Sequence, residues 1–158
     1  MSDRIPMTQA GYDRLTEELK QLKTVERRAI SKEIEVARAH GDISENAEFH
    51  AAKEKQSHIE GRIRIIEDRI ARAQVIEPGA EQPDSVRFGV TVELEDADSG
   101  ETVRYKIVGE DEADLERREI SITSPVARAL LGRVVGDAVT VRVPKGTREF
   151  EILDIGYH

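Results

Sequence analysis

Cysteine and tryptophan are absent from this sequence, and only six of its 158 residues are aromatic. Without cysteine the chain has no disulfide, no thiolate ligand for zinc or an iron–sulfur cluster, and no cysteine nucleophile. No apolar run approaches the roughly 18–20 residues that span a bilayer, and the N-terminus lacks the apolar stretch of a secretory signal. These absences predict a cytoplasmic protein with no membrane partner.

Recognisable catalytic motifs are also missing. The sequence has no phosphate-binding glycine loop, no dinucleotide fingerprint, no G-x-S-x-G and no H-E-x-x-H. None of the four histidines has a recognisable nucleophile as a partner in sequence. We therefore do not expect an enzyme with an active site of its own.

The charge is divided unevenly between the two halves of the chain. Residues 1–77 hold 14 Lys and Arg against 15 Asp and Glu, whereas residues 78–158 hold 10 against 17. A net charge of −8 argues against sequence-independent binding to naked nucleic acid, which relies on a broad positive surface. A narrow basic strip remains open.

Residues 7–75 have helical periodicity. Apolar side chains recur at alternating spacings of three and four, as in the a/d seam of a coiled coil. In the first arm these are Leu15, Leu19 and Leu22, followed by a less regular set of Ala29, Ile30, Ile34 and Ala37. In the second arm they are Ile59, Ile63, Ile66, Ile70 and Ala73. Thr8 is a plausible first N-cap. The pattern breaks near Gly41, which suits a helix end, and Asp42 or Ser44 could cap the next helix. A turn this short requires an antiparallel hairpin, about 40–45 Å long at 1.5 Å per residue.

The second half has the period-two alternation of strands, for example over residues 90–94, 103–107 and 139–143. A short helix is expected from Pro125, capped by Ser124 and ended by Gly132. The prediction is an α+β protein with a coiled-coil hairpin over 1–77 and an acidic tip at 41–48. A linker covers residues 78–84. Residues 85–158 then form a small antiparallel β domain that contains one helix.

The hairpin tip carries the chemistry. Asp42 and Glu45 are three residues apart, and two carboxylates can give oxygen ligands to Mg²⁺ if a partner supplies the rest. The same spacing resembles a capping box, in which both acids would only stabilise a helix start. His40 and His50 could join the acids in a zinc site, although the spacing matches no standard zinc motif.

Two further features of the arms are open to more than one interpretation. Phe49 could contact a partner or cover the end of the seam. Basic side chains near the tip could guide an RNA backbone or simply form a solvated face; they are Arg27, Arg28, Lys32, Arg38, Lys53 and Lys55.

Two long motifs resemble one family. Residues 41–54 read GDISENAEFHAAKE and resemble G-D-L-S-E-N-A-E-Y followed by H-A-A-[KR]-E, the tip signature of the bacterial Gre transcript-cleavage factors. Residues 124–132 read SPVARALLG and resemble that family's S-P-[LIV]-A-R-A-L-[IL]-G, and residues 7–19 match its opening. The resemblance covers the whole chain in order, and the scattered basic residues favour the GreA branch.

The resemblance implies an FKBP-like C-terminal domain that docks on the rim of the RNA polymerase secondary channel, and a hairpin that enters the channel. The tip acids Asp42 and Glu45 would help to hold the second Mg²⁺ of the polymerase active site, with Ser44 in a supporting role. The polymerase would then cut backtracked nascent RNA near its 3′ end. This implies a monomer that stimulates the polymerase in trans, with no cofactor bound to the factor alone.

The resemblance also implies contacts with RNA or polymerase at Phe49, Lys53 and Arg38, and at Ser124 and Pro125 in the C-terminal domain. Phe49 stands where the family has Tyr, and Ile43 where it has Leu. Three alternatives remain: a Gre-like channel regulator that does not promote cleavage, an FKBP-like prolyl isomerase, and a structural coiled-coil adaptor. The retained tip acids count against the first, and the scarcity of aromatics against the second. The adaptor would explain the hairpin but not its acid pair.

Overall fold

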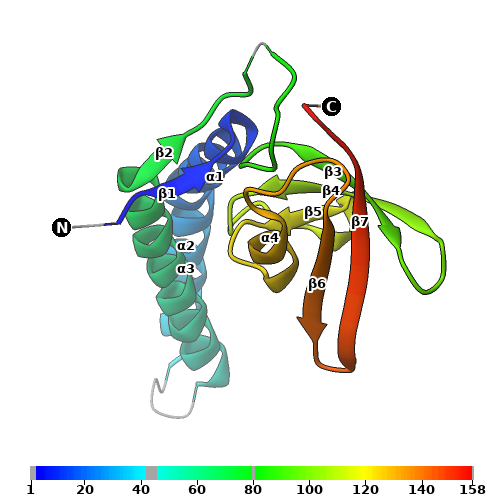
Figure 1. Cartoon of the computed structure of the whole chain (residues 1–158). Coiled ribbons are helices and arrows are strands. Elements are labelled where there is room, and N and C mark those ends of the chain that lie inside the picture. Colours follow the sequence, from blue (N-terminus) through cyan, green and yellow to red (C-terminus); the bar gives the residue numbers. More distant parts are fainter. Residues whose placement is uncertain (1–2, 42–45, 80, 158) are drawn as a thin grey trace. The chain divides into compact units, whose positions relative to one another are not determined.

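The computed structural model describes residues 3–41, 46–79 and 81–157. It contains two compact units, a helical unit over Tyr12–Ala73 and a β unit made of Arg4–Gly11 and Gln74–His158 (Figure 1). The expected α+β class is therefore confirmed. Among the described residues, no helix is both long and apolar enough to cross a membrane.

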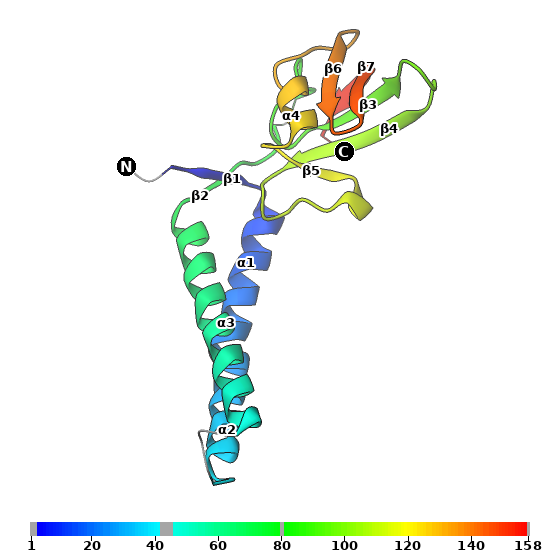
Figure 2. The same ribbon diagram turned by 90° about the horizontal axis from the view of Figure 1, so that it is seen from below.

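A helical hairpin forms the first unit. Its first arm is α1 (Gln9–Gln21), a π-helical turn η1 (Leu22–Glu26) and α2 (Arg27–Arg38), and its second arm is α3 (Ala47–Ala71). The two arms run side by side along their length (Figure 2). Thr8 is the N-cap of α1, because its hydroxyl accepts a hydrogen bond from the Gly11 amide at 3.1 Å. Gly41 follows α2 with a φ of 106°, so both of these predictions are confirmed.

The π-helical turn explains the looser stripe in the first arm. A heptad continued from Leu22 would put Ala29 in the seam, yet Ala29 is exposed and Ile30 is buried. A π-helical turn inserts one extra residue into an α-helix. The insertion moves the buried positions one residue along the chain, to Ile30, Ile34 and Ala37. The expectation that Ala29 belongs to the seam is therefore wrong.

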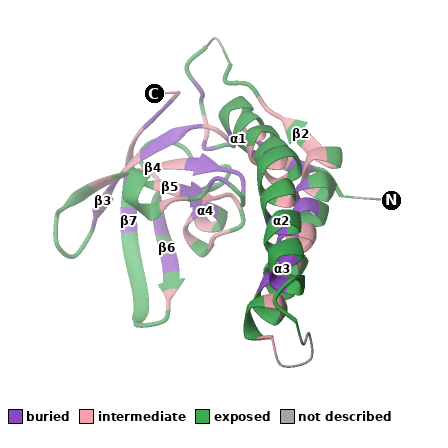
Figure 3. Cartoon of the chain, turned by 180° about the vertical axis from the view of Figure 1, so that it is seen from behind, coloured by how far each residue is buried: buried purple, intermediate pink, exposed green. Residues whose placement is uncertain are grey.

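Buried residues form a narrow stripe along α2 and α3 (Figure 3). Ile30 and Ile34 pack against Ala52, Ile59 and Ile63, with Leu19, Leu22 and Phe49 partly buried beside them. Ion pairs between the arms flank this stripe; they join Glu18 to Arg62, Lys23 to Glu67, Arg27 to Glu60 and Glu33 to Lys55. The Arg62 and Arg27 guanidinium groups each donate two hydrogen bonds to their carboxylates.

The root of the hairpin differs from the prediction. Residues expected to be helical up to Val75 instead form strand β2 (Ala73–Val75), which pairs with β1 (Ile5–Met7). Pro6 cannot continue a helix. Successive side chains of a strand point to opposite faces, so Ile5 and Met7 share one face of β1, and both are buried. The amide of Ile76 donates to the Met7 carbonyl at 2.9 Å and extends the pairing.

A five-stranded sheet forms the β unit, in the order β5-β4-β3-β7-β6. Its strands are β3 (Thr91–Asp96), β4 (Thr102–Val108), β5 (Glu119–Ser121), β6 (Ala138–Val143) and β7 (Gly146–Gly156). The expectation of an antiparallel sheet is wrong for one pair, because β4 and β5 are parallel. The connection between them, which includes the short 3₁₀ helix η3 (Leu115–Arg117), returns the chain to the same end of the sheet.

One face of this sheet is covered by the expected short helix, α4 (Pro125–Leu130). Ser124 is its N-cap, with the hydroxyl accepting from the Ala127 amide at 3.2 Å, and Pro125 occupies the first turn. Ala127 and Leu130 pack against core residues from all five strands, including Leu94, Ile107 and Ile120. The other face of the sheet carries polar and charged side chains.

Candidate functional site at the hairpin turn

The predicted tip residues Asp42, Ser44 and Glu45 lie outside the described residues. The residues on both sides of them are described. The first arm ends with Ala39, whose amide donates to the Glu35 and Val36 carbonyls, and His40, whose amide donates to Ala37. The second arm begins at Ala47.

Asn46 joins the two arms across the turn. Its side-chain oxygen accepts a hydrogen bond from the Phe49 amide at 3.0 Å, which makes Asn46 the N-cap of α3. Its side-chain nitrogen donates to the Ala37 carbonyl near the end of α2. One side chain therefore holds the start of α3 against the end of α2, and the acid pair lies in the segment that this bridge closes.

The position of this cap corrects the prediction. Asp42 or Ser44 was expected to cap the second helix, but that position belongs to Asn46. The capping-box interpretation of Asp42 and Glu45 fails for α3, because both acids precede the cap. The sequence signal for Asn46 was present, since asparagine is among the preferred N-cap residues. It was overlooked because Asp and Ser are preferred equally.

Phe49 closes the seam next to the turn. Its ring is partly buried against the hydrophobic cluster of the hairpin. The guanidinium carbon of Arg38 lies 5.8 Å from the ring centroid, and the His50 ring meets Phe49 edge-on at 5.7 Å. Cations over aromatic faces at this distance are stabilising. The structure thus brings two predicted contact residues, Phe49 and Arg38, into contact with each other at the end of the seam.

Several basic residues on the arms already have partners within the chain. The Arg27 guanidinium donates two hydrogen bonds to the Glu60 carboxylate, and these lower the pKa of Glu60. Lys55 pairs with Glu33 at 3.5 Å, and Lys53, which is exposed, donates to Gln56 at 3.1 Å. Arg28 and Lys32 are exposed. Arg28, Lys32 and Lys53 therefore lie on the exposed surface of the arms.

The zinc interpretation gains no support from the described residues. His40 lies 3.7 Å from Glu48, an exposed pair, and His50 packs its ring on Phe49. Within the part of the chain that the structure describes, no three His, Asp or Glu side chains are grouped as metal ligands would be.

A groove of about 520 Å³ lies between the arms near the turn. Its floor is apolar, formed by Val36, Ala37, Ala51 and Ala52, and Val36 is 59% exposed. Charged side chains form its rim: Lys32, Glu33, Glu48 and Lys55. Three of the four apolar lining residues are alanines, whose small side chains leave this hollow between the arms.

Two family models match the chain, one for each half. The model described as transcription elongation factor, N-terminal matches residues 5–75. The model described as transcription elongation factor, GreA/GreB, C-term matches residues 81–157. Both halves therefore point to a single class of protein, the transcription elongation factors.

Individual relatives agree over nearly the full length. The chain is 60% identical to transcription elongation factor GreA of Anaeromyxobacter sp. (strain K) over 154 residues, covering 98% of this chain and 93% of the relative. It is 53% identical to GreA of Alkalilimnicola ehrlichii over 155 residues, covering 98% of both chains. Among solved structures, Thermus aquaticus Gfh1 is 34% identical, with 98% of this chain and 99% of that chain covered and a TM-score of 0.45. The chain belongs to the GreA/GreB family of transcription elongation factors.

Proposed function

We propose that this elongation factor acts within RNA polymerase: the hairpin enters the secondary channel, and the tip acids Asp42 and Glu45 promote cleavage of backtracked nascent RNA by the polymerase. The observation that carries this proposal is the Asn46 bridge. Because Asn46 supplies the cap of α3, the helix does not need the acid pair as its cap. The role of the two carboxylates is then sought in a partner rather than in capping α3.

The chemistry of the acid pair suits Mg²⁺, which prefers carboxylate oxygens and shares its shell with water and phosphate. Asp42 and Glu45 would supply oxygen ligands, and the polymerase active site and the RNA phosphate would supply the others. In a two-metal site the second ion orients the attacking water and stabilises charge at the phosphate. The factor donates ligands in trans, needs no cofactor when alone, and the polymerase remains the nuclease.

The surrounding residues would position this pair. Arg38 and Phe49 pack against each other at the end of the seam, and Asn46 hydrogen-bonds the start of α3 to the end of α2. Ser44 would support the acids within the turn. Lys53, which is exposed on α3, would approach the RNA 3′ end. In the β unit, Ser124 and the exposed Pro125 would contact the channel rim at the start of α4.

Broader features of the resemblance belong to the same proposal. The hairpin would be a true coiled coil and the C-terminal domain FKBP-like. The domain boundaries would fall at 1–77, 78–84 and 85–158. The protein would work as a cytoplasmic monomer.

The test uses a backtracked elongation complex with 5′-labelled RNA and Mg²⁺. Asp42→Asn/Glu45→Gln removes two negative charges with almost no change in shape. We expect cleavage to fall at least about 100-fold, because a metal ligand contributes several kcal/mol to such a reaction. The melting temperature should be unchanged, since the cap at Asn46 is intact.

The matched control is Glu35→Gln/Glu54→Gln, which makes the same charge change on the arms and should cleave like the unmodified protein. If the tip variant cleaves normally, the acid pair is not a metal ligand. If the unmodified protein binds polymerase and cleaves nothing, the protein is a channel regulator instead.

A further inference from the structure

The sheet face opposite α4 carries a cluster of cations at its β4–β5 edge. Arg104 and Lys106 project from β4, while Arg117 and Arg118 lie in and just after η3. These four side chains, called here the basic edge, line two adjoining hollows of about 370 and 340 Å³. The core residues of the same strands, such as Ile107 and Ile120, face the other way.

The basic edge is unexpected in an acidic half of the chain. Residues 78–158 contain 10 Lys and Arg against 17 Asp and Glu, and four of those ten cations gather here. Arg104 pairs with Glu93 at 3.2 Å and Arg117 with Asp114 at 3.8 Å. Among the described residues, Lys106 and Arg118 have no carboxylate within ion-pair distance. The four cations stand against three carboxylates, those of Glu93, Asp114 and Glu119, so the edge keeps a net positive charge.

Arg118 has a backbone conformation that arginine rarely adopts. With φ 59° and ψ 36° it is left-handed, and among the described residues it alone has a positive φ without being glycine. Such a conformation costs a non-glycine residue roughly 1–2 kcal/mol. Its amide donates to Leu115 and its carbonyl accepts from Lys106, which hold the backbone in place. Glycine would relax this turn, so the presence of arginine indicates a use for the side chain.

Two neighbouring groups lack a partner of their own. The Oε1 atom of Glu119, at the wall of one hollow, is buried and has no hydrogen-bond partner among the described residues. Leu115, on η3, is 76% exposed. The edge thus offers cations, one unused acceptor for an N–H donor and one apolar side chain. Arginine and a buried apolar anchor are common features of protein–protein contacts.

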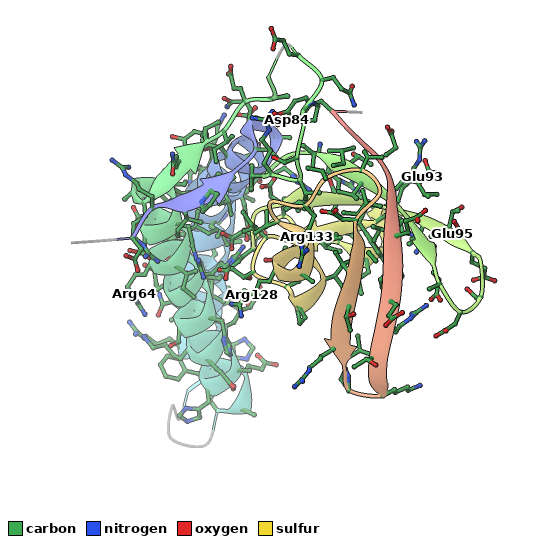
Figure 4. All side chains as sticks on the ribbon, viewed as in Figure 1. Arg64, Asp84, Glu93, Glu95, Arg128 and Arg133 are labelled. Atoms are coloured by element: carbon green, nitrogen blue, oxygen red, sulfur yellow. The ribbon has the colours of Figure 1, made fainter. Side chains whose placement is uncertain are left out.

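Acidic side chains on the same sheet face limit what could bind. Glu93 and Asp154 face each other across β3 and β7, and Glu95 lies opposite Glu151. Figure 4 shows Glu93 and Glu95 along β3, away from Arg128 and Arg133 near α4. A nucleic-acid backbone that continued beyond the basic edge would be repelled by these carboxylates. A polypeptide with a short acidic segment would be attracted to the edge alone.

We propose that the basic edge binds an acidic polypeptide segment of a partner protein. The segment's carboxylates pair with Arg104, Arg117 and Arg118, and an apolar side chain packs on Leu115. A backbone N–H of the segment donates to Glu119. The basic edge shares no residue with the hairpin turn or with Ser124–Pro125, so the proposal does not depend on the proposed cleavage function.

The test measures binding of a short fluorescein-labelled peptide of Glu and Asp with one central Leu to the full-length protein. Arg117→Ser/Arg118→Gly removes two cations and relaxes the left-handed turn, so it should fold at least as well as the unmodified chain. We expect it to weaken peptide binding about tenfold, the sum expected for two exposed charge pairs. Leu115→Ser should weaken binding severalfold while leaving its salt dependence unchanged.

The matched control is Arg128→Ser/Arg133→Ser, which makes the same charge change on the α4 side and should bind the peptide normally. Equal weakening by both variants would mean that only net charge matters and would overturn the proposal. Absence of peptide binding to the unmodified protein would overturn it too. Single-stranded RNA or duplex DNA that binds more tightly than the peptide, and through Arg117 and Arg118, would make the edge a nucleic-acid site instead.

Discussion

The helical unit and the β unit bury their apolar side chains in different ways. In the hairpin, the hydrophobic cluster holds five buried residues in one narrow stripe between two arms. In the β unit, thirteen form a continuous core between a sheet and α4. Ion pairs between the arms accompany the hairpin stripe, whereas the core of the β unit draws on all five strands.

The difference follows from geometry. A stripe between two helices buries little area per residue, but it extends over a long element. In sequence the acid pair falls between the two arms, at the turn for which we propose the metal-binding role. The broad core of the β unit instead joins five strands and α4.

Truncation of a core side chain should cost more in the β unit than in the hairpin. Leu94→Ala should destabilise its unit by about 3–4 kcal/mol and Ile63→Ala by about 2–3 kcal/mol. Leu94 is fully buried among several strands, so its cavity persists, whereas two helices can close partly over the gap at Ile63. Urea unfolding followed by far-UV circular dichroism measures both. If both variants lost the same free energy of unfolding and the whole chain unfolded in one transition, the two units would not differ in the cost of truncating a core side chain.

Loss of the Asn46 bridge should affect the hairpin alone. Asn46→Ala removes the cap of α3 and should cost about 1 kcal/mol. Asn46→Asp keeps the acceptor for the Phe49 amide, so the cap of α3 remains, but it has no N–H for the Ala37 carbonyl. Its loss of stability should therefore come from the lost bond between the arms and not from the cap. We expect both variants to slow RNA cleavage severalfold. If Asn46→Asp cleaves at the unmodified rate, the bond to Ala37 does not position the acid pair.

Deletion of Thr24 should leave stability nearly unchanged and still reduce function. Without the extra residue of η1, Leu22 and Ile30 would be seven positions apart and the seam would be a regular heptad. We expect the free energy of unfolding to change by less than about 1 kcal/mol. The first arm would shorten by about 1.5 Å, and misplacement of about 1 Å can cost up to a hundredfold in rate. Thr24→Ala is the control, because it removes the side chain without shortening the arm.

Acid should weaken both units through different carboxyls. The hydrogen bond from Arg148, and then those from the Asp98 and Ser99 amides, lower the pKa of Asp96 in the β unit. Arg27 lowers the pKa of Glu60 in the hairpin. A carboxyl whose pKa is lowered by folding stabilises the protein above its unfolded value, about 3.9 for Asp and 4.3 for Glu, and this stabilisation is lost as the pH falls through the folded value.

The measurement compares urea midpoints at neutral pH and near pH 3. Asp96→Asn and Glu60→Gln should each flatten the pH dependence of their own unit, with the smaller effect for Glu60, which is more exposed. An unchanged slope in Asp96→Asn would show that its ion pair with Arg148 makes no contribution in solution.

Elements defined by local signals could be predicted from the sequence. Thr8 and Ser124 were identified as caps because each precedes a periodic segment, and Gly41 because a helix end favours a left-handed glycine. Elements that depend on distant partners were missed. Strands β1 and β2 are three residues each and exist only because they pair with one another. The same holds for β5, whose parallel pairing with β4 has no local signature.

Periodicity and contiguous motifs are local properties of a chain, so the two-part organisation, the hairpin with acids between its arms, and the family could all be predicted from the sequence. The cap of α3, the shift of the seam at the π-helical turn, and the gathering of four cations at one sheet edge became evident from the folded chain. Each of these depends on groups that are not neighbours in sequence: Asn46 reaches Ala37 on the other arm, and Arg104 of β4 lines the same two hollows as Arg118, which precedes β5. Pairwise distances of that kind arise from packing, which no single segment encodes.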